Sequence, residues 1–298
     1  MERIAVLIPC LNEGKTIGKV VSDFREKLPE ANIYVFDNGS TDNTSQKATE
    51  AGAIVYKVGK RGKGNVVRSM FRKIDADIYV MTDGDDTYPL SNLDEMMQPV
   101  LRGEADMVVG DRLSSTYFTE NKRRFHNFGN RLMKSLINKL FNSDLQDILS
   151  GYRVFNRRFV KSINIKSDGF EIETEITAFA LYHNFDIMEV TVPYKDREPG
   201  NPSKLNTIKD GTRVLKTFVK VFRDYKPFKF FSFFSFIIAI VAIVLLVPVF
   251  QAYFETGLVE RFPTLIFGCF LLIASLLFFL SGIILQVIIN HDSINQNP

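Results

Sequence analysis

Residues 78–86 read Ile-Tyr-Val-Met-Thr-Asp-Gly-Asp-Asp, an apolar run that stops at a cluster of carboxylates. The same pattern occurs near the start of the chain, where the apolar residues 4–8 precede a polar loop at 9–14, and again where residues 32–36 precede 37–42. Short apolar runs of this kind are typical of strands that are buried on both faces of a parallel sheet. These three stretches therefore predict strands of an α/β domain, each followed by a polar loop.

Amphipathic segments alternate with these runs. One segment is predicted to form a helix from Thr16, and its apolar residues recur at helical spacing, namely Ile17, Val20, Val21 and Phe24. Gly62-Lys63-Gly64 opens a further helix that extends through Arg72, and more strands are predicted at 53–58 and 107–110. Strands that alternate with helices predict a mostly parallel, Rossmann-like sheet with helices on both faces. In such sheets ligands bind beyond the carboxyl ends of the strands, which is where the polar loops lie.

Two charge-free apolar runs near the end of the chain predict a transmembrane hairpin. A helix rises about 1.5 Å per residue and the hydrocarbon core of a bilayer is about 30 Å thick, so about 20 apolar residues span it. The alternative is a helical pair buried in a soluble core, but such helices rarely run this long without a charge. We therefore divide the chain into an α/β domain at 1–205, a juxtamembrane basic helix at 206–229, and transmembrane helices at 230–254 and 262–290.

The charges around the hairpin predict its orientation. Residues 195–229 include ten Lys and Arg against four Asp and Glu, whereas the loop between the two runs carries Glu255, Glu260 and Arg261. Because basic segments stay on the cytoplasmic side, the large domain and the C-terminus are both expected to be cytosolic. The basic stretch would also contact anionic membrane lipids. No nucleic-acid partner is expected, because the net charge is only +3 and no nucleic-acid motif accompanies the stretch.

Two further segments are predicted to form amphipathic helices. The first carries Arg124, Arg131 and Lys139 among apolar residues at helical spacing, namely Phe125, Phe128, Leu132, Leu136 and Leu140. The second runs from Asn206 to Tyr225. Two interpretations are open: the apolar stripe packs against the sheet, or it lies on a membrane surface with the basic residues at the headgroups.

Asp83 and Asp85 supply two carboxylates within one turn after a predicted strand. Hard divalent cations such as Mg2+ or Mn2+ take oxygen ligands, usually one or two carboxylates together with substrate phosphates. Asp is also common in turns, so the acidic turn alone leaves a purely structural interpretation open. Gly62-Lys63-Gly64 is similarly ambiguous, because a helix start can hold a phosphate on its backbone N–H groups, but a Gly-x-Gly can equally form a tight turn.

The combination of motifs is more specific than its parts. Residues 9–13 (Pro-Cys-Leu-Asn-Glu), 37–42 (Asp-Asn-Gly-Ser-Thr-Asp), 62–64 and 83–85, all at successive strand ends, resemble family 2 glycosyltransferases of the GT-A fold. Later motifs resemble the polyprenyl-phosphate branch of that family, which includes dolichyl-phosphate mannosyltransferase and the bactoprenol glucosyltransferases. These motifs are residues 110–112, 147–153, 170–175 and 197–204. The predicted hairpin matches the bactoprenol type.

The resemblance implies roles for residues on the donor side. The residues that would contact the base and ribose are Pro9, Asn12, Glu13 and Asp37. Asp83 and Asp85 would bind a Mg2+ or Mn2+ ion that bridges the donor diphosphate. The other donor-binding residues implied by position are Gly62, Lys63, Arg197, Ser203 and Lys204. The sequence departs from the family pattern at Asp86 and Thr87, which leaves a third protein ligand to the metal open.

On the acceptor side, the resemblance implies that Arg112 and Arg131 contact acceptor or diphosphate oxygens. Asp147 and Arg153 mark an acceptor-side turn, in which Asp147 can orient the site and Arg153 can brace the loop. The predicted catalytic residues are therefore Asp85, Asp147, Arg131 and Arg112.

The implied reaction is an inverting sugar transfer from a nucleotide diphosphate sugar to undecaprenyl phosphate or another polyprenyl phosphate, at a membrane such as the bacterial inner membrane. UDP-glucose or UDP-N-acetylglucosamine is the expected donor, and a GDP-mannose-dependent enzyme similar to dolichyl-phosphate mannosyltransferase is the alternative. A processive polysaccharide synthase is disfavoured because those enzymes carry a Gln-x-x-Arg-Trp motif and this chain has no Trp. A non-catalytic membrane scaffold is disfavoured by the intact Asp83 and Asp85. The resemblance also implies a homo-oligomer, specifically a tetramer.

Overall fold

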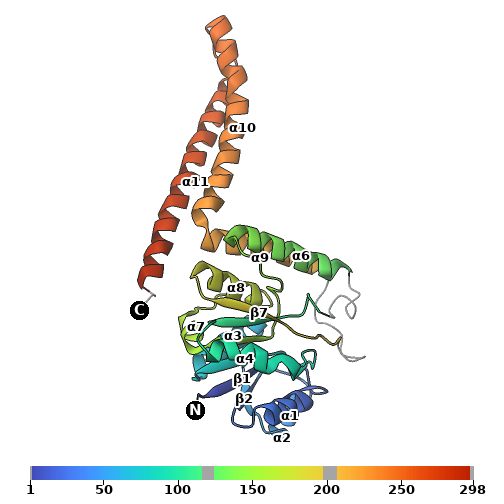
Figure 1. Ribbon diagram of the computed structural model, residues 1–298. Helices are drawn as coiled ribbons and strands as arrows, with labels where there is room; N and C mark the ends of the chain where they lie inside the picture. The colour runs from blue at the N-terminus through green and yellow to red at the C-terminus, as the bar shows by residue number, and fades with distance from the viewer. Residues whose placement is uncertain (1, 116–123, 197–206, 296–298) are drawn as a thin grey trace. The chain divides into compact units, whose positions relative to one another are not determined.

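The structure is a computed structural model (Figure 1). It describes the backbone of residues 2–115, 124–196 and 207–295, and the side chains of 2–115, 129–196 and 215–290. The predicted site residues Arg197, Ser203 and Lys204 lie outside the described residues. The chain divides into two compact units, Met1–Phe218 and Val219–Pro298, and each is described by itself.

The first unit is built around a seven-stranded sheet in the order β3-β2-β1-β4-β6-β5-β7 (Figure 1). The strands are β1 Ile4–Cys10, β2 Asn32–Asp37, β3 Ile54–Lys57, β4 Ile78–Met81, β5 Met107–Asp111, β6 Arg153–Asn156 and β7 Ile187–Thr191. Neighbouring strands are parallel except that β6 is antiparallel to both β4 and β5. The prediction of a mostly parallel α/β sheet is therefore confirmed.

Helices cover both faces of this sheet (Figure 1). Their bounds are α1 Ile17–Lys27, α2 Thr44–Glu50, α3 Lys63–Lys73, α4 Leu93–Leu101, α7 Arg157–Ser162 and α8 Ile172–Tyr182, with a 3-10 turn at Leu90–Asn92. Two further helices are α6 Arg124–Phe141, which packs on α8, and α9 Thr207–Tyr225. The apolar side of α1 is buried as its spacing predicted, and α1 and α4 share one core cluster with β1. In contrast, α3 packs against α7 and α8.

The sequence predicted neither β6 nor β7, and the reversed strand β6 is the one that shapes the edge of the sheet. In the sheet, Arg153 at the start of β6 pairs with Met81 at the end of β4 and with Val109 near the end of β5. An antiparallel strand presents its amino end where its neighbours present their carboxyl ends. The turn that precedes β6, residues 147–152, therefore joins the loops that follow β4 and β5 at one edge of the sheet.

Helix α6 packs through a different face from the stripe that the sequence suggested. Asn130, Met133 and Ile137 are buried, and α6 contacts α8. Leu132 belongs to the predicted stripe, yet 37 % of its surface is exposed, and Leu136 is only half-buried. Among the described residues, the Leu132 stripe therefore flanks the buried face, and its location on a membrane surface stays a prediction. The helix is apolar on two sides, and one of them stays accessible.

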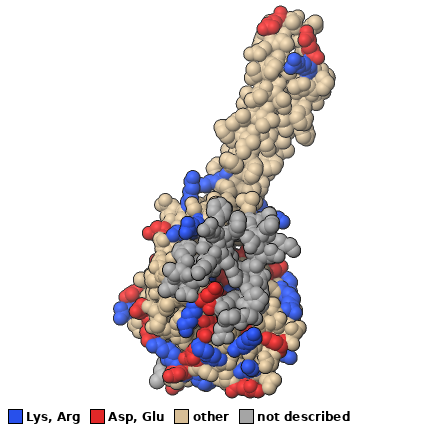
Figure 2. Space-filling model, turned by 90° about the vertical axis from the view of Figure 1, so that its right-hand side faces the viewer, with Lys and Arg blue, Asp and Glu red and all other residues tan. Residues whose placement is uncertain are grey.

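The second unit is a hairpin of two long helices, α10 Pro227–Thr256 and α11 Phe262–Asn295. Gly257 ends α10 in the left-handed region, with φ of 71°. By length and composition, both helices are apolar enough to cross a membrane. On the face shown in Figure 2 the body of the hairpin carries no Lys, Arg, Asp or Glu, and charged side chains gather at the tip where its two helices are joined.

Small residues let the two helices of the hairpin approach closely. Ser235 Oγ donates to the Ser275 carbonyl at 2.8 Å, and Ser275 Oγ donates to the Ser235 carbonyl at 2.9 Å. Seven residues on either side of Ser275 lie Gly268 and Gly282, where a Cβ would come within 2.6 Å of Leu246 and 2.9 Å of Phe231. Small residues at a heptad spacing are typical of helices that pack tightly inside a membrane.

Candidate active site

The loops at the carboxyl edge of the sheet bring most of the predicted site residues together. Cys10 at the end of β1 pairs with Asp37 at the end of β2, so the loops after these strands are neighbours. The predicted residues on or beside this edge are Pro9, Asn12, Glu13, Asp37, Gly62, Lys63, Asp83, Asp85, Arg112 and Asp147. Arg131 is on α6, outside these loops, and its side chain is exposed.

The loops after β1 and β2 are tied to each other by hydrogen bonds. The Asn12 backbone N–H donates to Ser40 Oγ at 2.9 Å, and Asn12 Oδ1 accepts from the Thr41 N–H at 2.8 Å. The Glu13 N–H donates to Thr44 Oγ1 at 2.9 Å. Asn12 itself has a φ of 54°, a conformation that Asn tolerates better than most residues. The side chain of Asn12 thus fixes the shape of the loop.

Asp37 is held as a carboxylate. Its Oδ1 accepts the Ser40 N–H at 2.8 Å, and its Oδ2 accepts the Ser45 hydroxyl. Burial alone would raise the pKa of Asp37, but the hydrogen bonds from Ser40 and Ser45 outweigh it and lower the pKa. Hydrogen bonds that stabilise the charged form act in this direction.

The start of α3 uses its glycines for close backbone contact. The Gly62 N–H donates to Asn38 Oδ1 at 2.7 Å, and the Gly64 N–H donates to the Gly169 carbonyl at 3.1 Å. A Cβ on Gly62, whose φ is 117°, would lie 2.0 Å from the Asp168 carbonyl oxygen. These N–H groups already have partners, so the geometry favours the tight-turn interpretation over a phosphate cradle. The group that faces the acidic loop is the side chain of Lys63.

Lys63 makes two ion pairs at the centre of the edge. Its Nζ lies 2.5 Å from Asp83 Oδ1 and 2.7 Å from Glu173 Oε1. Burial alone would lower the pKa of Lys63, but the Coulomb attraction of Asp83 and Glu173 raises it above its usual range. Glu173, at the start of α8, was not among the predicted site residues. It belongs to the quoted motif at 170–175, but no local pattern shows that its carboxylate reaches Lys63.

Asp83 and Asp85 form the acidic turn after β4. Asp85 Oδ1 accepts the Thr87 hydroxyl at 2.7 Å, and Asp86 turns away to pair with Lys19 at 2.8 Å. Within the described residues, no group of three or more His, Cys, Asp or Glu side chains is arranged to hold a metal ion. Two carboxylates still fit a hard divalent cation that takes its other ligands from phosphate oxygens and water.

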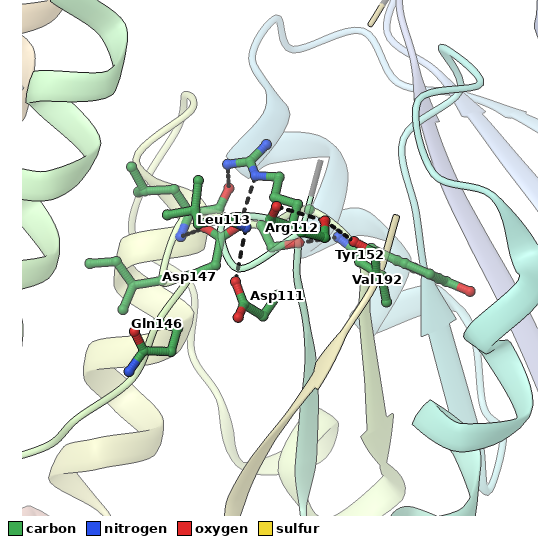
Figure 3. A network of polar contacts seen from close by, with 12 residues as sticks. Asp111, Arg112, Leu113, Gln146, Asp147, Tyr152 and Val192 are labelled. Carbon is green, nitrogen blue, oxygen red and sulfur yellow. Dashed lines mark hydrogen bonds and ion pairs between the residues drawn. The ribbon is translucent and has the colours of Figure 1, made fainter. Parts of the chain in front are cut away.

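Arg112 and Asp147 form a buried ion pair (Figure 3). Arg112 Nε donates to Asp147 Oδ2 at 2.8 Å, and Nη2 donates to the Leu149 carbonyl at 3.1 Å. Arg112 Nη1 also donates to the Tyr88 hydroxyl at 3.3 Å. The Asp147 side chain is 1 % exposed, so this carboxylate is enclosed by the pair. Both residues thereby fix the turn that precedes β6.

Arg153 and Glu189 fix the same turn through hydrogen bonds to its backbone. Arg153 is fully buried and donates to the carbonyls of Ser150 at 2.9 Å and Ile148 at 2.8 Å. Burial lowers the pKa of Arg153 to about 10. Glu189 Oε1 accepts the Asp147 N–H at 2.8 Å, and burial raises the pKa of Glu189. Arg153 braces the loop, as one interpretation of the sequence suggested.

The family model described as "Glycosyl transferase family 2" matches residues 5–163, more than half of the chain. The chain belongs to this family. Glycosyltransferase AglJ of Haloferax volcanii is 34 % identical over 226 residues, which cover 76 % of this chain and 73 % of the relative. The polyprenol monophosphomannose synthase of Mycolicibacterium smegmatis is 24 % identical, covering 74 % of this chain and 86 % of the relative.

A solved structure confirms the fold of this glycosyltransferase. Glucosyl-3-phosphoglycerate synthase from Mycobacterium tuberculosis, in complex with Mn2+ and UDP-glucose, matches with a TM-score of 0.61 at 22 % identity. The match covers 74 % of this chain and 79 % of that chain. The expected GT-A fold is therefore confirmed, with the hairpin following it.

Gly64→Ala tests the close approach at the start of α3. A Cβ there would lie 2.2 Å from the Ser167 carbonyl oxygen and 2.7 Å from its carbon. We expect the strain to lower the free energy of unfolding by about 2 kcal/mol, measured by thermal denaturation of the purified chain. Gly59→Ala is the matched control, because nothing lies within 4 Å of a Cβ at Gly59. Equal melting temperatures for the two variants would contradict the tight contact.

Arg112→Ala tests the buried ion pair. The change leaves the Asp147 carboxylate buried without its guanidinium, so we expect a loss of about 3 kcal/mol in the free energy of unfolding. Arg112→Met combined with Asp147→Leu should lose less, because it removes both charges. Arg3→Ala is the control, since Arg3 forms exposed ion pairs with Asp75 and Asp77 and should have little effect. A loss no larger than that of the control would show that Arg112 is no brace.

Proposed function

We propose that this glycosyltransferase moves a sugar from a nucleotide diphosphate sugar to a polyprenyl phosphate, with inversion at the anomeric carbon. The observation that carries the proposal is that one chain joins the Asp83–Asp85 turn of a family 2 fold to two helices long enough to cross a membrane. A nucleotide-sugar donor accounts for the acidic turn, and a lipid acceptor accounts for the two apolar helices. The name of the mycobacterial relative supports a polyprenol phosphate product.

The donor is proposed to be UDP-glucose or UDP-N-acetylglucosamine, and undecaprenyl phosphate is the proposed acceptor. The UDP-glucose bound in the structural neighbour supports the first choice. GDP-mannose is the second candidate, supported by the mannose in the product name of the mycobacterial relative. Transfer from a UDP-sugar or from GDP-mannose releases a nucleoside diphosphate. The residues at the edge of the sheet would therefore bind the same kind of leaving group in either case.

Asp83 and Asp85 would hold Mg2+ or Mn2+ against the donor diphosphate. Such an ion offsets the negative charge that builds up on the leaving diphosphate. Thr87 orients the Asp85 carboxylate through its hydroxyl, which is 2.7 Å from Oδ1. The Mn2+ in the structural neighbour supports a divalent cation in this fold.

The acceptor requires no general base from the protein. A phosphate monoester has a second pKa near ~6, so a polyprenyl phosphate is largely dianionic at pH 7. One of its oxygens would attack the anomeric carbon as the bond from that carbon to the diphosphate oxygen breaks. Asp147 is paired with Arg112 and is 1 % exposed, which suits an orienting residue and not a base. Arg131 is proposed to bind the lipid phosphate, because a guanidinium binds phosphate in a bidentate manner.

The membrane orientation is also part of the proposal. The ten basic residues between 195 and 229, against four acidic ones, support a cytosolic location of the catalytic unit and the C-terminus. The accessible Leu132 and Leu136 of α6, next to Arg131, suit a helix that lies in the headgroup region of membrane lipids. The bacterial inner membrane and a homotetramer remain proposals from the family resemblance.

A donor panel tests the reaction. Membranes that contain the full chain are incubated with undecaprenyl phosphate and each of UDP-glucose, UDP-N-acetylglucosamine and GDP-mannose, and the lipid products are separated by chromatography. We expect one donor to give a lipid-linked sugar, EDTA to abolish it, and Asp85→Asn to slow turnover by about 10³-fold. Asp94→Asn, an exposed carboxylate, is the matched control. No lipid product from any donor, or near-normal turnover of Asp85→Asn, would contradict the proposal.

Arg131→Ala tests the acceptor site. Losing a charge-assisted contact with phosphate should raise the KM for the lipid phosphate by about ten-fold or more, while donor binding stays nearly unchanged. Arg131→Lys should restore the KM in part, because it keeps the charge but not the planar fork. Lys139→Ala, two turns further along α6, is the matched control and should change the KM little. If Arg131→Ala abolished nucleotide-sugar binding and left the lipid KM alone, Arg131 would belong to the donor diphosphate.

A further inference from the structure

Asp83, which is proposed to bind a metal ion, already forms an ion pair with the ammonium of Lys63. The ammonium of Lys63 lies 2.5 Å from Asp83 Oδ1 and 2.7 Å from Glu173 Oε1. The Lys63 side chain is 11 % exposed and Glu173 is 6 % exposed, whereas Asp83 is 25 % exposed. Asp83 is therefore the open end of this cluster, and Glu173 is its buried end.

The backbone around the cluster holds it in place. A Cβ on Gly151 would lie 2.6 Å from Asp83 Oδ2 and 3.1 Å from Lys63 Nζ, so the turn before β6 closes directly over the pair. The Gly151 N–H donates to the Tyr88 hydroxyl, which also accepts from Arg112. At the other end, the first turn of α3 is anchored on segment 167–169. These backbone contacts fix the position of Lys63 beside the acidic turn.

A divalent cation and an ammonium compete for the same carboxylate. Each stabilises the negative charge of Asp83, and the two repel each other at short range, more strongly where water is largely excluded. A donor diphosphate changes this balance, because its oxygens can accept both cations at once. Binding of the metal ion and binding of the donor are then coupled: each is favoured when the other is present.

We propose that Lys63 is a resident counter-ion of Asp83, tethered by Glu173, that makes divalent-cation binding at Asp83 and Asp85 depend on the donor diphosphate. When the donor binds, the ammonium moves from Asp83 to a diphosphate oxygen and keeps its contact with Glu173. Glu173 is a positioning residue in this scheme. The inference rests on the proposed function only in taking a nucleoside diphosphate as part of the donor.

Mn2+ titration of the purified full chain tests the proposal, with free Mn2+ measured by electron paramagnetic resonance. For the wild type, we expect UDP or GDP to tighten Mn2+ binding by about ten-fold or more. For Lys63→Met without nucleotide, we expect the Kd for Mn2+ to fall by about ten-fold or more, because the competing charge is gone. The nucleotide should then improve Mn2+ binding much less than in the wild type.

Two further variants complete the design. Lys60→Met is the matched control: it removes a lysine from the same loop whose side chain is 68 % exposed and pairs with Asp168, and should leave Mn2+ binding as in the wild type. Lys63→Met leaves Asp83 and Glu173 without their shared cation, so thermal denaturation checks its folding. If Lys63→Met fails to fold, the double variant Lys63→Met with Glu173→Gln removes the Glu173 charge as well. The double variant should still bind Mn2+ more tightly than the wild type without nucleotide.

The outcomes separate this proposal from the proposed reaction. Nucleotide-free Mn2+ binding that is no tighter in the folded Lys63 variants than in the wild type would overturn the counter-ion role. Wild-type binding that is equally tight with and without UDP and GDP would overturn it too. The nucleotide-free comparison uses no sugar and no lipid. A failed donor panel beside tighter Mn2+ binding in Lys63→Met would therefore refute the reaction and leave the counter-ion role intact.

Discussion

Carboxylates that are partly or fully removed from water at the edge of a sheet are costly unless cations or hydrogen-bond donors hold them, and this constraint organises the site. Asp83 is held by Lys63 of α3, and Asp147 is held by Arg112 at the end of β5. Glu189 of β7 accepts the backbone N–H groups of Gln146 and Asp147, where the turn before β6 begins. Because each partner comes from a different element, balancing the charges also fixes the positions of the loops.

The reversed strand β6 makes these contacts possible. Only its amino end can deliver the 147–152 turn to the edge where β4 and β5 end. The sequence predicts β1 to β5 because their apolar runs and polar loops form a local pattern. It does not predict β6, which has four residues and contains the buried Arg153, or β7, in which no residue is fully buried. Likewise, Asp83 and Asp85 form a recognisable motif, whereas Glu173 meets Lys63 only through the folding of distant segments.

Helix α6 shows a second limit of sequence patterns. Periodicity identifies the helix, but this helix has apolar residues on two sides, and the pattern does not say which side packs. Met133 and Ile137 are buried while Leu132 is exposed, and the helix that α6 contacts is α8, far along the chain. The glycines at 62 and 64 were ambiguous for a similar reason. Whether such glycines meet a ligand or another part of the backbone depends on tertiary contacts, here with segment 167–169.

The reciprocal serine contact in the hairpin has a mechanical consequence. Because Ser235 and Ser275 each donate to the other's carbonyl, a lengthwise slip of one helix against the other breaks both bonds at once. At about 1.5 Å per residue, the charge-free stretch 230–254 of α10 extends about 38 Å, which exceeds a hydrocarbon core of about 30 Å. A helix that is too long for its bilayer accommodates the mismatch by tilting, by kinking or by thickening the bilayer locally. With the register locked, a tilt of one helix in the proposed membrane would carry the other helix with it, so the hairpin would respond to bilayer thickness as one body.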